Sequence, residues 1–372
     1  MKTLVSKTLS SILFALVLPL LALGQTDSVK AGFEIKGFID AYYVYDFQRP
    51  DDHIRQPFLY NHNRHNEFNI NLAMLHAAYE KSNVRARLGI MAGTYAQDNY
   101  AAEENLLKNV FEANVGVALN KRRSLWLDAG IFPSHIGFES AISTENPTLT
   151  RSLLAENSPY FLSGAKLSWS VSEAWTFTAL ITNGWQRIAR PFGNQAPGVG
   201  TQLQYQPHER LTFNWSTYAG SDAHDSLDQV MLFNNLYLNL LPSDKFQLIA
   251  GFDIGAREAA YTMQGSMRVD NDDWDLWYTP IIIGRIGLSR QLFLAGRAEY
   301  YSDPTGVIID YGAPAGFETW GFSVNLDYYI QENAMFRIEG RSFRSQQAIF
   351  PAEGAFRSSN TFIAGSLAIM FP

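Results

Sequence analysis

Cysteine is absent from the 372-residue chain. Its absence excludes a disulfide framework and thiol catalysis. After residue 24, no uninterrupted apolar stretch reaches the roughly 18 residues that a membrane helix needs. Positive charge is scarce as well, because 29 Lys and Arg stand against 36 Asp and Glu, for a formal net charge of −7. Without a basic patch, nucleic acid is not an expected partner.

The N-terminus carries the features of a secretory signal peptide. Lysines precede the apolar run "SILFALVLPLLALG", and small residues close it at Ala22 and Gly24. Pro19 and the abrupt change to polar sequence argue against a structural helix. We therefore expect an exported protein with a removed signal peptide at 1–24, a short periplasmic segment at 25–32 and a β-barrel at 33–372.

Most of the remaining chain alternates apolar and polar side chains with period two. In "VRARLGIMA", Arg85 and Arg87 fall on one face, whereas Val84, Leu88 and Ile90 fall on the other. The segments "WGFSVNLDYY" and "MFRIEGRS" alternate in the same way. This pattern predicts strands with one apolar and one polar face, because successive side chains of a strand point to opposite sides.

The connections between these strands alternate in length. Short polar turns are predicted at 81–83, 121–124, 172–174, 207–210, 242–245, 289–290 and 331–332. Long loops lie near 48–65, 96–108, 133–159, 185–197, 221–227, 258–271, 303–314 and 346–357. This rhythm predicts an all-β transmembrane barrel of about sixteen antiparallel strands, with short periplasmic turns and long extracellular loops. The alternative, a soluble sandwich or propeller, would lack the rhythm.

In such a barrel the polar face of each strand lines the interior. An arginine on the lipid face near the midplane would cost about 2–4 kcal/mol, so charged residues should point inward. Their signs nearly balance, which predicts weak net ion preference, and some of them could instead pair as structural salt bridges. The predicted lining residues are Lys36, Asp40, Arg85, Arg87, Glu112, Asp128, Lys166, Asp253, Arg285, Arg297, Glu299, Asp327, Arg337, Glu339 and Arg341.

One strand departs from the alternation. In "FNINLAMLHAAYE", the face that holds Phe68, Ile70, Leu72 and Met74 would next present His76 to lipid. A β-bulge adds one residue to a strand and thereby shifts its phase. We expect a bulge in this strand.

The longest loop, at 133–159, is the candidate for a constriction. Its segment "LTRSLLAEN" can form a short helix, and Glu139, Glu145, Arg151 and Glu156 supply charge. Folded inward, the loop would narrow the channel, as the third loop does in general porins. Folded outward, it would cap the surface. We favour the inward arrangement.

The sequence offers little support for a catalytic site. Ser134 and His135 are adjacent, but the chain has no G-x-S-x-G motif and no acid placed to orient the histidine. We therefore predict no enzymatic activity, no catalytic residue and no cofactor. An outer-membrane lipase remains a third alternative, in which Ser134→Ala would abolish phospholipid hydrolysis.

Two polar clusters could attract a metal ion. "HNRHNE" offers His62, His65 and Glu67 after His53, but His-x-x-His alone is a weak signal, so packing of the loop is favoured. "DNDDWD" at 270–275 lacks the spaced ligands and the glycine of a calcium loop. We predict no metal site.

Several long motifs resemble one known family. They are "GFIDAYYVYDF", "YNHNRHNEFNINLA", "MAGTYAQDNYAAE", "LWLDAGIFPSHIGFESAI", "LLAENSPYFLSGAKL" and "NGWQRI", within about residues 37–206. Together they resemble the OmpL-like β-barrel porin-2 family, found mainly in Bacteroidetes-type bacteria. The resemblance implies an outer-membrane barrel with pore function and supplies no substrate.

The sequence thus predicts a bacterial outer-membrane channel for passive diffusion of small hydrophilic solutes and ions. A barrel with a closed lumen, whose loops act as an adhesin or receptor scaffold, is the alternative from another class. Expected partners are outer-membrane lipid, the solutes and the barrel-assembly machinery, and both a monomer and a homotrimer are compatible with the sequence. The assembly machinery would read a C-terminus in which Phe371 precedes a final Pro372.

Overall fold

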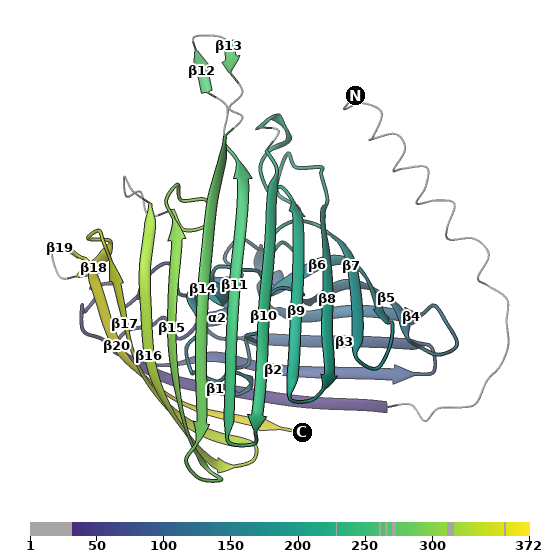
Figure 1. The fold of residues 1–372 in the computed structure, drawn as a ribbon, viewed down its shortest axis with the longest axis horizontal. Helices are drawn as coiled ribbons and strands as arrows, with labels where there is room; N and C mark the ends of the chain where they lie inside the picture. Colours follow the sequence, from purple (N-terminus) through teal and green to yellow (C-terminus); the bar gives the residue numbers. More distant parts are fainter. Residues whose placement is uncertain are drawn as a thin grey trace. The chain divides into compact units, whose positions relative to one another are not determined.

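The computed structural model describes residues 32–227, 229–259, 262–264, 267–269, 273–310, 316–352 and 355–372. The predicted signal peptide and most of 25–32 lie outside them, as do residues 270–272 of "DNDDWD". Sixteen strands pair with their neighbours into one closed barrel, and the last strand returns to the first (Figure 1). They are β1 (Gly32–Asp46), β2 (Phe68–Lys81), β3 (Val84–Ala92), β4 (Val110–Ala118), β5 (Leu125–Pro133), β6 (Phe161–Ser170), β7 (Trp175–Thr182), β8 (Gly198–His208), β9 (Leu211–Gly220), β10 (Met231–Ser243), β11 (Phe246–Glu258), β14 (Trp274–Gly287), β15 (Leu292–Asp303), β16 (Phe317–Gln331), β17 (Ala334–Ser345) and β20 (Ser359–Phe371).

The remaining elements lie in the long connections. They are the helices α2 (Thr94–Asn99) and α3 (Leu153–Glu156), the 3-10 turns η1 (Asn105–Asn109), η2 (Ser143–Glu145) and η3 (Asp225–Leu227), and the short strands β12 (Thr262–Gln264), β13 (Met267–Val269), β18 (Phe350–Ala352) and β19 (Ala355–Arg357). Each connection predicted to be short is short, and each predicted to be long is long. The predicted strand number and antiparallel order are therefore confirmed.

Period-two alternation places apolar side chains outside and polar side chains inside. On β16, Phe322 and Val324 are exposed on the outer face, whereas Asn325 and Asp327 are buried. Aromatic residues form outer-face contacts near both ends of the strands, for example Trp175 with Tyr205, whose rings are 4.5 Å apart. No helix among the described residues is long and apolar enough to span a membrane.

The predicted bulge is present in β2, but earlier than its apolar pattern suggests. The register of β1 and β2 shifts because Asp40 pairs with Leu72 whereas Ala41 pairs with Ile70, which leaves Asn71 as the extra residue. The assignment of Leu72 and Met74 to the lipid face is therefore wrong. Both are buried inside the barrel with Phe38.

Candidate functional site: the barrel interior

The predicted lining residues differ in how much water reaches them. Lys36 is exposed, and Arg85, Arg87, Lys166 and Arg285 are partly buried. All the others are shielded from solvent as fully as a protein core: Asp40, Glu112, Asp128, Asp253, Arg297, Glu299, Asp327, Arg337, Glu339 and Arg341. Something other than water must satisfy these buried charges, because an unpaired buried charge is very costly.

On β15 to β17 they first satisfy one another. Three ion pairs join these strands: Arg297 to Glu339 at 2.9 Å, Arg341 to Glu299 at 2.5 Å and Arg337 to Asp327 at 2.7 Å. Each pair joins side chains that alternation sends to the same face. The three arginines are named the arginine latch below, because of what they hold.

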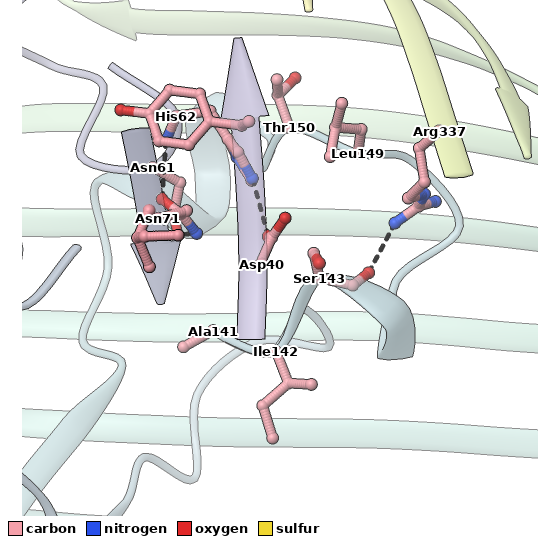
Figure 2. Close-up of polar contacts among 12 residues, drawn as sticks. Asp40, Asn61, His62, Asn71, Ala141, Ile142, Ser143, Leu149, Thr150 and Arg337 are labelled. Atoms are coloured by element: carbon pink, nitrogen blue, oxygen red, sulfur yellow. Dashed lines mark hydrogen bonds and ion pairs between the residues drawn. The ribbon is translucent and has the colours of Figure 1, made fainter. Parts of the chain in front are cut away.

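The connection between β5 and β6, residues 134–160, passes through the interior and is named the crossing loop. Arg337 donates to the backbone carbonyl of Ser143 at 2.6 Å (Figure 2). It also donates to the carbonyl of Asn146 at 3.0 Å. Arg297 and Arg341 donate to the carbonyls of Thr150 and Arg151, both at 2.7 Å. The latch therefore binds main-chain oxygens of the loop.

The carboxylates of the same strands bind the loop's amides. Glu339 accepts from the Thr150 amide and Glu299 from the Leu153 amide, both at 2.6 Å. Each carboxylate thus binds an arginine of the wall with one oxygen and the crossing loop with the other. Charged acceptors make stronger hydrogen bonds than neutral ones, which fixes the loop at these points.

The other arm of the crossing loop is bound to β8, β9 and β10. The carbonyl of His135 accepts from Ser216 at 2.6 Å and from Gln202 at 3.0 Å, and the Gly137 amide donates to Asn235 at 3.1 Å. The His135 ring contacts the Thr217 carbonyl through Nε2 at 2.9 Å. Both groups proposed for the lipase alternative are thus used in holding the loop, since the Ser134 hydroxyl accepts from the amide of Ile136.

The four candidate constriction residues have different environments. Glu145 is exposed, whereas Arg151 is buried and donates to the carbonyls of Ser140 and Ala141. Glu139 accepts from both the amide and the hydroxyl of Ser152, and burial raises the pKa of Glu139. These contacts fold the loop tightly upon itself.

Glu156 joins the crossing loop to the connection between β1 and β2. Its carboxylate accepts from the amides of Tyr60 and Asn61, at 2.9 and 3.2 Å. Burial raises the pKa of Glu156 to about 7. The two loops therefore share one buried carboxyl group that titrates near neutral pH.

The histidines of "HNRHNE" pack this β1–β2 connection against β1. His62 contacts the Asp40 carboxylate at 2.9 Å (Figure 2), and the Asp46 amide donates to the His65 ring. The ring of His53 contacts the His65 carbonyl. Within the described part of the chain, no group of three or more His, Asp or Glu side chains is arranged to hold a metal ion.

Apolar residues fill the interior at the end where the long loops lie. One cluster joins Trp277, Phe317, Phe343 and Phe362 of the wall to Phe58 of the β1–β2 connection. It also takes in Leu149 and Leu153 of the crossing loop and Ile309, Ile349 and Phe350 of other loops. Period-two alternation did not predict this core. The signal that could have shown it is that consecutive residues such as Trp277 and Tyr278 are both aromatic, so that both faces of the strand are apolar there.

A cavity of about 520 Å³ lies between the crossing loop and the short-turn end of the wall, and is named the vestibule. Its lining includes Lys36, His76, Phe111, Glu139, Glu145 and Tyr237. Nearby on the inner wall, Arg85 is bound to Asp128 at 2.5 Å, and the Lys166 ammonium lies over the Phe132 ring at 4.5 Å. Polar and charged groups thus reach water mainly in this half of the interior.

Comparison with known proteins agrees with this architecture. The family model of the β-barrel porin-2, OmpL-like, proteins matches residues 32–371. The chain belongs to this family. It is accordingly an outer-membrane porin, and its closed barrel agrees with the outer-membrane barrel that the resemblance implied.

Solved porins share this fold at low sequence identity. The anion-selective porin from Comamonas acidovorans has a TM-score of 0.59 and 9% identity, covering 92% of this chain and 100% of that one. The DcaP channel of Acinetobacter baumannii has a TM-score of 0.58 and 9% identity, covering 94% of this chain and 100% of that one. OmpT of Vibrio cholerae, in its trimer form, has a TM-score of 0.56 and 9% identity, covering 92% of this chain and 100% of that one. No curated protein matches the sequence.

Proposed function

We propose that this porin lets small hydrophilic solutes and ions diffuse passively across the outer membrane. The observation that carries the proposal is the closed sixteen-stranded barrel with a vestibule lined by polar and charged side chains. A barrel of this size encloses more space than wall side chains alone can fill. The protein provides a hydrated passage with fixed charges, and the concentration gradient of the solute drives the flux.

The crossing loop is the constriction in this proposal. It is bound to β8–β10 on one side and to β15–β17 on the other, so a solute has to pass beside it or wait for it to move. On the short-turn side, Lys36 is exposed and Arg85, Arg87 and Lys166 are partly buried, whereas Glu112 and Asp128 are buried against His76 and Arg85. The cations are therefore the more accessible charges, which favours weak anion preference.

Its partners follow from the same reasoning. The outer apolar face is proposed to contact lipid, and Phe371 at the end of β20 is proposed as the signal for the barrel-assembly machinery. A homotrimer is the proposed assembly, in line with the trimeric OmpT structure. Light scattering of the detergent-solubilised protein would show three copies per particle, and a monomer would contradict this assembly.

The function is tested by reconstitution. The mature protein in liposomes should let arabinose and glucose enter and so cause swelling, whereas protein-free liposomes and liposomes with raffinose should not swell at a comparable rate. In a planar bilayer the same preparation should give discrete current steps. A correctly folded barrel that gives neither swelling nor current would refute the channel function and leave only the scaffold alternative, which the comparisons do not support.

A further inference from the structure

The crossing loop is a flap with a narrow base. Its two ends meet at the neighbouring strands β5 and β6, where Pro133 pairs with Phe161 and the Ser134 amide donates to the Tyr160 carbonyl at 2.9 Å. Its other backbone–backbone hydrogen bonds close within the loop, as from Glu145 to Ile142. The wall on β15 to β17 holds the far part of the flap through side chains.

We propose that this structure is the closed state of a gated channel, in which the crossing loop opens by releasing residues 143–153 from the arginine latch while the barrel wall stays paired. The inference rests on the proposed channel function, because a gate has meaning only for a conducting pore. What moves is one connection and the loop segments packed on it.

Release leaves no buried charge without a partner. Arg337 keeps Asp327, Arg297 keeps Glu339, and water replaces the carbonyls and amides of the departing loop. If the arginines of the wall were paired only with the loop, opening would leave their charges without partners. Because the wall charges are paired among themselves, the closed and open states can lie close in free energy.

The β1–β2 connection must move with the flap. Phe58 packs in the same apolar cluster as Leu149 and Leu153, and Glu156 binds Tyr60 and Asn61. Opening therefore exposes apolar surface of both segments at once, which makes it cooperative and keeps the closed state the more populated one. Two-state elements of this kind give discrete openings instead of a graded pore.

The turning point of the flap lies at Gly137. This residue has φ of +85°, and a side chain built there would meet no atom within 4 Å. The open space permits the backbone to rotate, and the positive φ favours glycine over other residues. Gly137 is the last bound residue of the arm held by β8, β9 and β10, through its amide to Asn235, so that arm can stay in place while the rest of the loop swings.

The absence of native cysteine allows a direct test. Ser143 is fully buried under Arg337, and Ser143→Cys provides a single thiol that a hydrophilic thiol reagent reaches only when the flap is released. Gln204→Cys, on the partly buried inner face of β8, is the control for a thiol in the open half. In membranes, the Ser143→Cys thiol should react at least about tenfold more slowly than the Gln204→Cys thiol, because it reacts only from the released state.

The latch is then weakened in that background. Arg337→Gln should speed the reaction of Ser143→Cys by about tenfold or more, the effect of losing charge-assisted hydrogen bonds to the loop. Arg285→Gln is the matched control, because Arg285 faces the same Asp327 at 3.6 Å and donates to Tyr329, a residue of the wall. It should leave the rate unchanged.

The outcomes separate the gate from the channel. A conducting protein whose Ser143→Cys thiol stays unreactive, with and without Arg337→Gln, would overturn the gate and leave the channel standing. A thiol that Arg337→Gln accelerates in a protein that never conducts would support release of the flap and overturn the channel. If Ser143→Cys fails to fold, amide hydrogen exchange at Leu149 and Thr150 in the otherwise unchanged chain measures the same release, and should also quicken with Arg337→Gln.

Discussion

The two halves of the barrel interior are built differently. At the long-loop end, inward-facing aromatic residues such as Phe343 and Trp277 pack against loops as in a globular core. At the short-turn end, Lys166, Gln204 and Tyr237 are only partly buried, and Tyr237 lines the vestibule. The same wall therefore supports a closed core in one half and a hydrated vestibule in the other, and the difference comes from the loops that fold into only one of them.

The largest expected effect comes from removing what fills the closed half. Deleting residues 138–156 takes away the latched segment and α3, and the single-channel conductance in a planar bilayer should rise severalfold, since pore area sets the ion flux. Deleting residues 260–272, between β11 and β14, serves as the control for loop loss. Unchanged conductance after the deletion would count against a constriction.

Stability should separate a core site from a lipid-facing site on neighbouring strands. Phe343→Ala opens a cavity among Phe58, Phe350 and Phe362, and should lower the free energy of unfolding by about 3–5 kcal/mol. Phe322→Ala on β16 faces outward, where lipid chains can fill the space, and should cost less. Urea titration of folding into vesicles measures both. Equal losses would mean that the interior packing contributes little.

Charge should matter more in the open half. Lys166→Glu reverses a charge on the inner wall near the vestibule, and should raise the cation-to-anion permeability ratio roughly twofold, because a partly screened charge changes local ion energies by less than about 1 kcal/mol. Reversal potentials in a salt gradient measure the ratio. Lys121→Glu, in a short exposed turn, is the matched control, and a shift as large as that of Lys166→Glu would show that position inside the barrel is irrelevant.

The smallest expected effect is a change in pH dependence. Burial raises the pKa of Glu156 to about 7, so the packed loops hold a proton there that released loops would not hold between the ordinary value of 4.5 and 7. This group therefore favours the packed loops increasingly as pH falls from 7 to 4.5. Below pH 4.5 the carboxyl is protonated in both states, and its contribution no longer changes. Glu156→Gln should remove that slope from the rate at which the Ser143→Cys thiol reacts.

His135 is the other buried titratable group of the loop, and burial lowers its pKa to about 4. It lies in the arm that stays bound when the flap is released, so its ionisation should be nearly the same in the packed and released states. Because His135 is present in both proteins, its contribution cancels in the difference between the parent and Glu156→Gln. A difference that stays flat from pH 4.5 to 7 would contradict the role given to Glu156.

The sequence predicted the strands of the barrel wall better than it predicted the loops and side chains that fill the interior. Alternation within strands such as 84–92, together with short turns between long loops, was enough for the strand number, the antiparallel order and the barrel. Alternation reports that two faces differ, but it cannot distinguish an inward residue that meets water from one that meets a loop. Arg87 and Arg297 therefore look alike in the sequence, although Arg297 is buried under Thr150.

The remaining features depend on contacts between distant segments. The pairing of Glu156 with Tyr60 and Asn61 joins residues more than ninety positions apart, and the crossing loop itself has no periodicity that would reveal its path. The bulge at Asn71 could be expected from the conflict around His76, but its position could not, because Leu72 and Met74 suit lipid and the loop-packed interior equally well.

The most direct test of a gated channel is a single-channel recording of the mature, otherwise unaltered protein in a planar bilayer. A barrel whose loops close one half should rest mostly in a non-conducting state and show brief, discrete openings that Arg337→Gln lengthens and Arg285→Gln does not. A continuously open pore of constant conductance, insensitive to Arg337→Gln, would contradict the closed half, and complete electrical silence in every variant would contradict the channel.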